Sequence, residues 1–289
     1  MRRYPGLMTM AVVTDSGACL PSTFAAAHGI TVVDLHTVPA AGQGAAPTTA
    51  GPSVEELAEA YEAALGHADT VLALHLSAAL SGTVDSARLA AGRIGGDRVR
   101  VLDSGTVGGG LGLAALAAAT ASDLRHGVAL ARETAGRATV LLVVEDLGHL
   151  RRGGRIDRST ALLGSALGVR PVLTVSEGRL TVAETVRGGA RARRHVVERA
   201  VHAAGGSGLV GPRPPADPVL VAVHHCHAPQ AAEELEEDLA RALGVSGARV
   251  DALLRAAAGP AIEVHTGPGA LAVSVAPALA EIRIQPEDD

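Results

Sequence analysis

Short apolar runs alternate with helical patterns along the first half of the chain, and this alternation constrains the fold more than any other feature. Runs typical of buried strands cover residues 10–15, 30–36, 70–76, 98–103 and 139–146. Helical patterns follow several of them, as at residues 53–65, where Ser53 and Glu56 have the spacing of a capping box. Such an alternation predicts an α/β protein with a mostly parallel, doubly wound sheet.

The pattern changes near residue 150. A basic, glycine-broken junction is followed by two β runs, with Ser176, Glu177 and Gly178 between them as a hairpin signal. The later elements are a basic helix, a strand and another helix, at residues 190–204, 219–225 and 230–243. We therefore predict two α/β domains, residues 1–150 and 151–289, the second with a mixed sheet.

Composition excludes several classes of function. The net charge of −5, without a basic stripe or an aromatic platform, argues against nucleic-acid binding. Only two cysteines occur, Cys19 and Cys226, which indicates a reducing compartment and no disulfide framework. The N-terminus lacks the apolar stretch of a signal peptide, and the longest apolar runs reach roughly half a membrane span. These observations predict a cytoplasmic protein that is not transmembrane.

Polar residues follow several of the predicted strands. They are Asp15 and Ser16, the stretch around Thr49, residues 77–81 and residues 103–104. Ligands of parallel sheets bind beyond the carboxyl ends of the strands, so these residues are candidates for a binding site. Aspartate and serine are equally favoured as caps of turns and helices, and that interpretation of Asp15 and Ser16 stays open.

Ser81, Gly82 and Thr83 stand where a helix is predicted to begin. Gly82 allows a ligand to approach the backbone, and the amides of a helix N-terminus attract a carboxylate or phosphate. A plain N-cap is the alternative. Ser81 as a catalytic nucleophile is a third interpretation, but the G-x-S-x-G motif of such serines is missing here.

Metal and nucleotide sites find little support. The histidines and cysteine of residues 224–227 alternate across a strand and cannot converge on one ion, so we expect no metal and no cofactor. Neither a dinucleotide-binding fingerprint nor a Walker loop occurs. The arginines of residues 151–156 could bind an anion or form a solvated turn.

Taken together, these stretches resemble the DegV family of bacterial fatty-acid-binding proteins. The resemblance runs from about residue 10 to residue 275 and rests on the order of its motifs. They are VVTDSGACLP, TAGPSVEEL, LSAALSGTVDSA, VLDS, EDLGHLRRGGRI, GVRPVLTVSEGRL and HTGPGALAV.

The resemblance implies a two-domain fold with a long-chain fatty acid in a hydrophobic tunnel between the domains. Thr49, Ser81 and His265 match the positions that hold the carboxylate. Asp15, Ser16, Gly82 and Thr83 would support the mouth of the pocket, and Arg155 matches a basic residue near a phosphoryl-transfer site. The protein would be a non-catalytic subunit that presents the fatty acid to a separate ATP-dependent kinase, which resembles dihydroxyacetone kinase, for phospholipid synthesis.

Three positions depart from the family pattern. Ala50 and Gly51 replace the usual Ser and Gln, and Gly108 stands where a Ser is often found. An alternative function is hydrolysis of acyl esters, with Ser81 as nucleophile and His265 as base. That hypothesis requires the two side chains to face each other across the domains.

Overall fold

The computed structural model describes residues 9–40, 46–156, 169–206 and 217–279. A first sheet contains four parallel strands in the order β2-β1-β5-β6. Their bounds are β1 Met10–Asp15, β2 Ile30–Val33, β5 Thr70–His75 and β6 Val99–Asp103. The predicted parallel sheet is confirmed.

A second, mixed sheet has the order β11-β10-β12-β7-β8-β9, in which only β10 and β11 are parallel neighbours. Its strands are β7 Thr139–Val143, β8 Val169–Ser176, β9 Arg179–Arg187, β10 Val219–His225, β11 Val250–Ala257 and β12 Leu271–Pro277. The predicted hairpin joins β8 and β9. Glu177 and Gly178 both have positive φ angles there, as a tight two-residue turn requires.

The strand at residues 139–143 departs from the expected pattern. The alternation predicted that it continues the parallel sheet, whereas β7 lies between β12 and β8 in the mixed sheet, antiparallel to both. A run of apolar residues indicates burial on both faces but does not specify the neighbouring strands. The change of sheet thus comes before Thr139, while the domain boundary near residue 150 stays a prediction.

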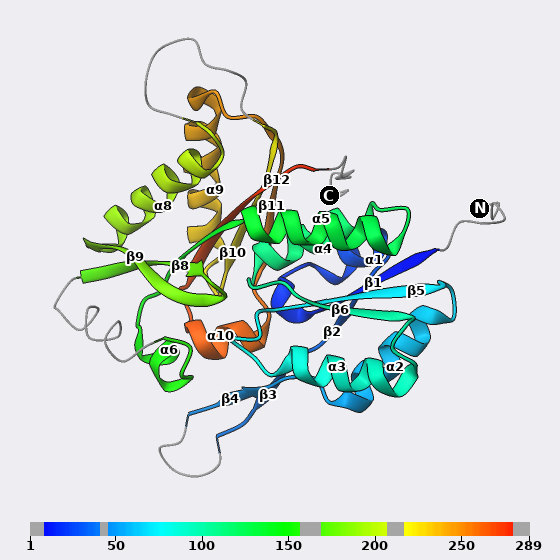
Figure 1. Ribbon diagram of the computed structural model, residues 1–289. Coiled ribbons are helices and arrows are strands. Elements are labelled where there is room, and N and C mark those ends of the chain that lie inside the picture. The colour runs from blue at the N-terminus through cyan, green and yellow to red at the C-terminus, as the bar shows by residue number, and fades with distance from the viewer. Residues whose placement is uncertain (1–8, 41–45, 157–168, 207–216, 280–289) are drawn as a thin grey trace.

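Helices separate and cover the two sheets (Figure 1). The helices are α1 Ser22–Ala27, α2 Val54–Leu65, α3 Thr83–Ile94, α4 Gly109–Ala119, α5 Leu124–Arg137, α6 Gly148–Arg152, α8 Gly189–Ala203, α9 Pro229–Ser246 and α10 Pro260–Thr266, with a short 3-10 helix, η1, at Ser16–Ala18. Helices α2 and α3 cover the outer face of the first sheet, α4 and α5 lie between the sheets, and α8 and α9 cover the outer face of the second.

Helix α4 is the central element of this arrangement. Every residue from Gly109 to Ala118 is buried, because the helix packs against strands of both sheets. Small side chains allow that fit: a Cβ at Gly112 would lie 2.6 Å from the carbonyl oxygen of Ala18. The N-terminus of α4 therefore lies deep in the molecule, between the sheets.

A local sequence signal explains where helix α2 begins. Ser53 caps α2 by accepting a hydrogen bond from the Glu56 amide, and the Glu56 carboxylate accepts one from the Ser53 amide at 2.8 Å. The predicted capping box is confirmed. A small antiparallel ribbon of β3 His36–Val38 and β4 Thr48–Ala50 precedes α2 and contacts α10.

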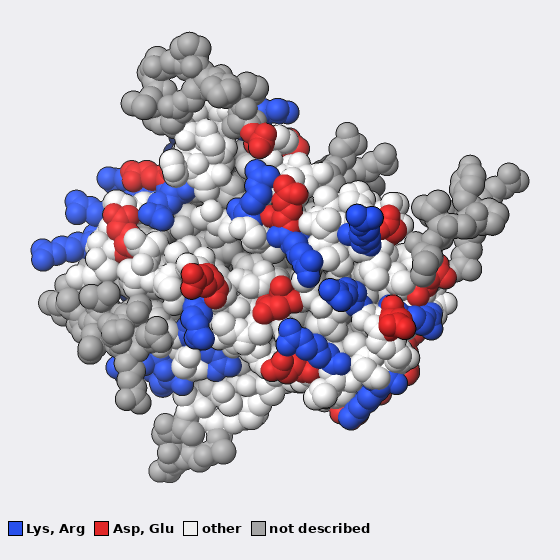
Figure 2. Space-filling view, in the orientation of Figure 1, with Lys and Arg blue, Asp and Glu red and all other residues white. Residues whose placement is uncertain are grey.

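One face of the surface carries basic and acidic side chains interspersed with each other (Figure 2). Among the described residues of this face, the figure shows no continuous basic track that could follow a nucleic-acid backbone. Ion pairs of the molecule include Arg193 with Glu234 and Arg255 with Glu236.

Candidate functional site

The carboxyl end of β1 is anchored by a buried network of polar side chains. The Asp15 carboxylate accepts hydrogen bonds from the amides of Gly17 and Leu76 and pairs with His75 Nδ1 at 2.9 Å. The other ring nitrogen of His75 meets the Tyr61 hydroxyl at 2.9 Å. Burial raises the pKa of Tyr61, so this hydroxyl stays protonated. Asp15 thus links the ends of β1 and β5 and positions the loops that follow them.

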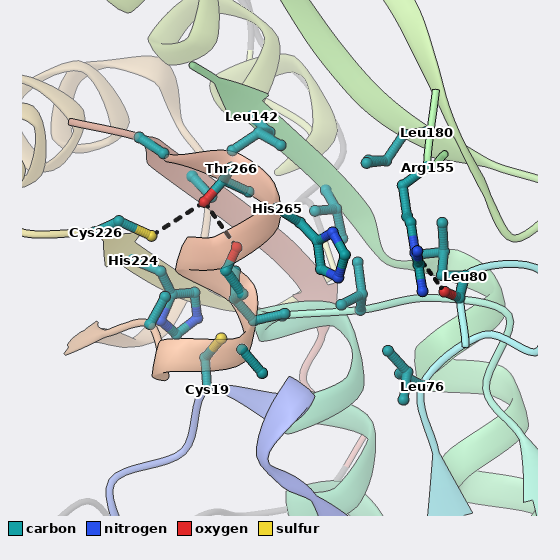
Figure 3. A pocket seen from close by; sticks show the side chains of 18 of the residues that line it. Cys19, Leu76, Leu80, Leu142, Arg155, Leu180, His224, Cys226, His265 and Thr266 are labelled. Carbon is teal, nitrogen blue, oxygen red and sulfur yellow. Dashed lines mark hydrogen bonds between the residues drawn. The ribbon is translucent and has the colours of Figure 1, made fainter. Parts of the chain in front are cut away.

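A pocket lies where these loops meet the second sheet (Figure 3). The space between its lining atoms is about 990 Å³, open solvent at its mouth included. Apolar side chains from both halves of the chain form most of its wall, and leucines and alanines are the commonest. They include Leu35, Leu76, Leu80, Leu142, Leu150, Leu180, Ala261, Ala270, Leu271 and Ala272.

Several half-buried polar residues line the pocket, and we call four of them the mouth cluster: Thr49, Ser81, Arg155 and His265. Thr49 lies on β4 and His265 on α10, yet Thr49 Oγ1 and His265 Nε2 are 2.6 Å apart. This hydrogen bond joins residues 216 positions apart in sequence. The structure therefore brings together the three side chains that the resemblance assigned to the carboxylate, in one lining.

The imidazole of His265 is neutral at physiological pH. Burial, and secondarily the charge of Arg155, lowers its pKa to about 4. Gly153 packs directly against the ring, because a Cβ there would overlap His265 Nδ1. A neutral ring donates from one nitrogen only, so its proton position depends on the Thr49 hydroxyl and on any ligand.

The turn after α10 explains the glycines near His265. Pro260 begins α10 at a position that suits proline, and Gly267 and Gly269 both have positive φ angles. A Cβ at Gly267 would lie 2.8 Å from the His149 ring, and one at Gly269 would lie 2.8 Å from Glu145. This close approach to residues before and within α6 orients His265 toward the pocket.

Ser81 belongs to the same lining but makes a different hydrogen bond. Its hydroxyl lies 2.8 Å from Thr83 Oγ1. Ser81 comes shortly before α3, and Thr83 is the first residue of that helix. Gly82 is the residue preceding α3, as the sequence predicted, but its side-chain position faces open space. Gly51 lies against Thr83, where a Cβ would come within 2.9 Å of Thr83 Oγ1, so a larger side chain would disturb Ser81 through Thr83.

Arg155 places a cation in the pocket lining. Its Nε donates to the Leu80 carbonyl oxygen at 3.0 Å, and a terminal nitrogen donates to the Gly153 carbonyl. Burial lowers the pKa of this guanidinium. The two carbonyl contacts fix the side chain and leave further N–H groups for an anion.

The four residues predicted to support the mouth lie behind the pocket wall instead of in it. Asp15 belongs to the buried network, and Ser16 Oγ accepts a hydrogen bond from the amide of Leu35, a lining residue. Thr83 supports Ser81, and Gly82 precedes the helix. They reach the pocket only through neighbours, and their role there stays a prediction.

Sequence reasoning missed the polar residues deeper in the pocket. Cys19, His224, Cys226, Thr266 and Ser274 also line it. Cys226 Sγ meets Thr266 Oγ1 at 3.2 Å, and burial raises the pKa of Cys19 to about 12, so that thiol is not ionised. His225 lines the pocket as well, and nothing in the sequence indicates that the end of β10 borders a cavity.

The structure also bears on the alternative chemistries. Ser81 bonds to Thr83 and His265 bonds to Thr49, so the structure does not hold Ser81 and His265 as the hydrogen-bonded pair that a hydrolase needs. Among the described residues, no three His, Cys, Asp or Glu side chains gather as metal ligands. Nor does that part of the chain contain a helix long and apolar enough to cross a membrane.

Comparison with known proteins identifies the family. The sequence model of the DegV family, described as an uncharacterised protein, matches residues 39–278. A DegV domain-containing protein of Streptomyces coelicolor is 38% identical over 290 residues, covering 92% of this chain and 98% of the relative. The chain belongs to the DegV family.

Solved DegV structures have the same architecture. A DegV family protein from Corynebacterium glutamicum is 34% identical with a TM-score of 0.81, covering 94% of this chain and 98% of that one. A DegV family protein from Thermus thermophilus, described as binding fatty acid, is 32% identical with a TM-score of 0.79, covering 93% of this chain and 100% of that one. The DegV fold predicted from the motifs is confirmed.

Proposed function

We propose that the protein binds one long-chain fatty acid in the pocket between its two sheets, with the carboxylate at the mouth cluster. The Thr49–His265 hydrogen bond carries this proposal, because it brings polar groups from both halves of the chain to one end of an apolar cavity. Its DegV neighbour from Thermus thermophilus is a fatty-acid-binding protein, which supports the same ligand here.

The chemistry of the lining suits a carboxylate. A buried carboxylate is costly unless it accepts hydrogen bonds or meets a cation. The Thr49 hydroxyl can accept from His265 Nε2–H while it donates to the ligand, and the Ser81 hydroxyl supplies a further donor. The acyl chain adds about 0.8 kcal/mol for each CH₂ that it buries.

We further propose that the protein is a carrier that presents its fatty acid to a separate ATP-dependent kinase, which forms an acyl phosphate for phospholipid synthesis. Arg155 would act on the phosphoryl group that reaches the carboxylate, since its side chain is fixed at the mouth by two carbonyl oxygens. We expect Arg155→Ala to leave fatty-acid binding nearly intact and to slow phosphorylation by the kinase. Loss of binding instead would make Arg155 a carboxylate ligand.

The direct test is mass spectrometry of lipids extracted from the purified protein. We expect one fatty acid per chain, and uptake of added oleate or palmitate by the delipidated protein. Neither bound fatty acid nor uptake would overturn the proposal.

Variants test the carboxylate position. Ser81→Ala and His265→Ala should weaken fatty-acid retention more than Asp15→Asn, because Asp15 lies in the buried network and does not line the pocket. Retention is measured on folded protein only, after size-exclusion chromatography. Equal retention in all three variants would remove the assignment.

A further inference from the structure

The pocket has a second polar feature, in the wall formed by the second sheet. We call His224 and Ser274 the inner pair. His224 lies on β10 and Ser274 on β12, neighbouring antiparallel strands in which Ala222 pairs with Ser274 and His224 with Ala272. Because side chains alternate along a strand, both members point to the same face of the sheet, toward α4. In Figure 3, His265 lies between His224 and Arg155.

Both side chains converge beside the N-terminus of α4. A Cβ at Gly109 would lie 2.8 Å from His224 Nε2 and 2.7 Å from Ser274 Oγ. Glycine at this position therefore allows two polar side chains that line the pocket to pack directly against the backbone of α4. A side chain at Gly109 would clash with both.

The inner pair is buried and has no hydrogen-bond partner among the described residues. His224 is 5% exposed and Ser274 is 0% exposed, and neither ring nitrogen nor the hydroxyl is bonded. Burial lowers the pKa of His224, and the nearby main chain of Ala256 raises it in part. The contact with Ala256 does not have the geometry of a hydrogen bond. Buried polar groups are nearly always satisfied, so these three atoms require an explanation.

The other buried, unpartnered side-chain atoms of the described residues differ from the inner pair. The hydroxyls of Thr14, Thr106 and Thr134 do not line the pocket, and His265, whose Nδ1 is unpartnered, bonds to Thr49 through Nε2. Cys226 and Thr266, which do line it, bond to each other. The inner pair thus combines buried, unpartnered polar atoms with a position on the cavity wall.

We propose that the inner pair binds an oxygen atom carried on the acyl chain, so that the preferred ligand is a hydroxy or oxo fatty acid. This inference rests on the proposed function. A neutral imidazole offers one donor and one acceptor, and the Ser274 hydroxyl can both donate and accept, so either a hydroxyl or a keto oxygen can be satisfied. An unsubstituted chain would bury the same atoms without partners, and sites of this kind discriminate against ligands that lack the polar group.

The test compares stearic acid with its monohydroxy isomers. Each competes with a fluorescent fatty acid on the delipidated full-length protein, which gives a dissociation constant for every position of the hydroxyl group. We expect a hydroxyl at one region of the chain to improve affinity by about tenfold, the scale of one hydrogen bond. Binding of stearic acid at least as tight as every isomer would overturn the inference.

Three variants complete the test. Ser274→Ala and His224→Leu should reduce the hydroxyl preference to near one while they retain stearic acid. Ser81→Ala makes the same change as Ser274→Ala at the other end of the pocket, so it should weaken both ligands and preserve their ratio. Circular dichroism verifies that each variant is folded. Ser274→Ala removes a single oxygen atom, so it still tests the inner pair if His224→Leu fails to fold.

The outcomes separate the two proposals. Stearic acid binding without a hydroxyl preference, or a preference unchanged in both inner-pair variants, contradicts the inner-pair proposal alone, and a bound water then satisfies these atoms. Binding of neither ligand by the wild-type protein contradicts the proposed function and the inference with it.

Discussion

The mouth cluster and the inner pair line the same pocket, but they differ in the hydrogen bonds that their polar atoms make. Thr49 and His265 bond to each other, and Ser81 bonds to Thr83. His224 and Ser274 bond to nothing in the described residues. The mouth residues come from separate elements and loops, whereas the inner residues are fixed by the register of adjacent strands. Rigid, unpartnered groups depend on a ligand more strongly than groups that satisfy one another.

The largest effect is expected from the network behind the mouth cluster. Asp15→Ala leaves His75 and the amides of Gly17 and Leu76 without their acceptor, so we expect a loss of roughly 3–5 kcal/mol in unfolding free energy. Denaturant titration measures it. Asp103→Ala is the matched control, because Asp103 accepts amide hydrogen bonds in a half-buried setting and should cost less. Equal losses would show that Asp15 is not a special anchor.

Acid tests the inner pair next. Burial lowers the pKa of His224 to about 4, against about 6.5 for an unperturbed ring. The unfolded chain therefore takes up a proton before the folded chain does, and the unfolding free energy falls as the pH drops from 6.5 toward 4, by roughly 3 kcal/mol. The contribution is complete above pH 6.5.

Denaturant titration at several pH values checks this slope. His224→Leu should flatten it. His265→Ala should flatten it less, since the pKa of His265 is lowered in the same direction but its ring is half-buried. A larger contribution of His265 than of His224 to the pH dependence of the unfolding free energy would contradict our comparison of the mouth cluster with the inner pair.

Two glycines provide a matched pair of smaller changes. Gly109→Ala forces a methyl group against His224 and Ser274, which the sheet holds in place, so we expect about 1–3 kcal/mol of destabilisation. Gly153→Ala pushes on the His265 ring, which can rotate away. That variant should lose less stability but more affinity for a fatty acid, measured by thermal unfolding and by displacement of a fluorescent ligand. The opposite ranking would contradict the difference in rigidity.

The smallest effect is expected at Thr49. Thr49→Val removes the hydroxyl that meets His265 and should cost about 1 kcal/mol of stability. Thr174→Val is the control, because Thr174 also lines the pocket and donates to the Val140 carbonyl oxygen at 2.8 Å. Thermal unfolding compares their stabilities, and only Thr49→Val should weaken the binding of oleate. Equal weakening would remove Thr49 from the mouth.

Local patterns predicted much of the fold. The parallel strands, the capping box of Ser53 and Glu56, and the Glu177–Gly178 hairpin depend on neighbouring residues and were found as expected. Membership of β7 in the mixed sheet was not predictable, because strand pairing is chosen by residues far away in sequence. The meeting of Thr49 with His265 was expected only through resemblance to the DegV family.

The sequence by itself determined which residues form strands and helices, since hydrophobic periodicity and turn chemistry act over a few residues. It also supplied His224, in a run of histidines and a cysteine, and His265, before a glycine-proline-glycine turn, but not the partners of either. Only the tertiary structure decided that one bonds to Thr49 while the other lies unpartnered beside Ser274 and Gly109. The reason is that burial and hydrogen-bond partners are set by how the sheets pack around α4, which no short stretch of sequence encodes.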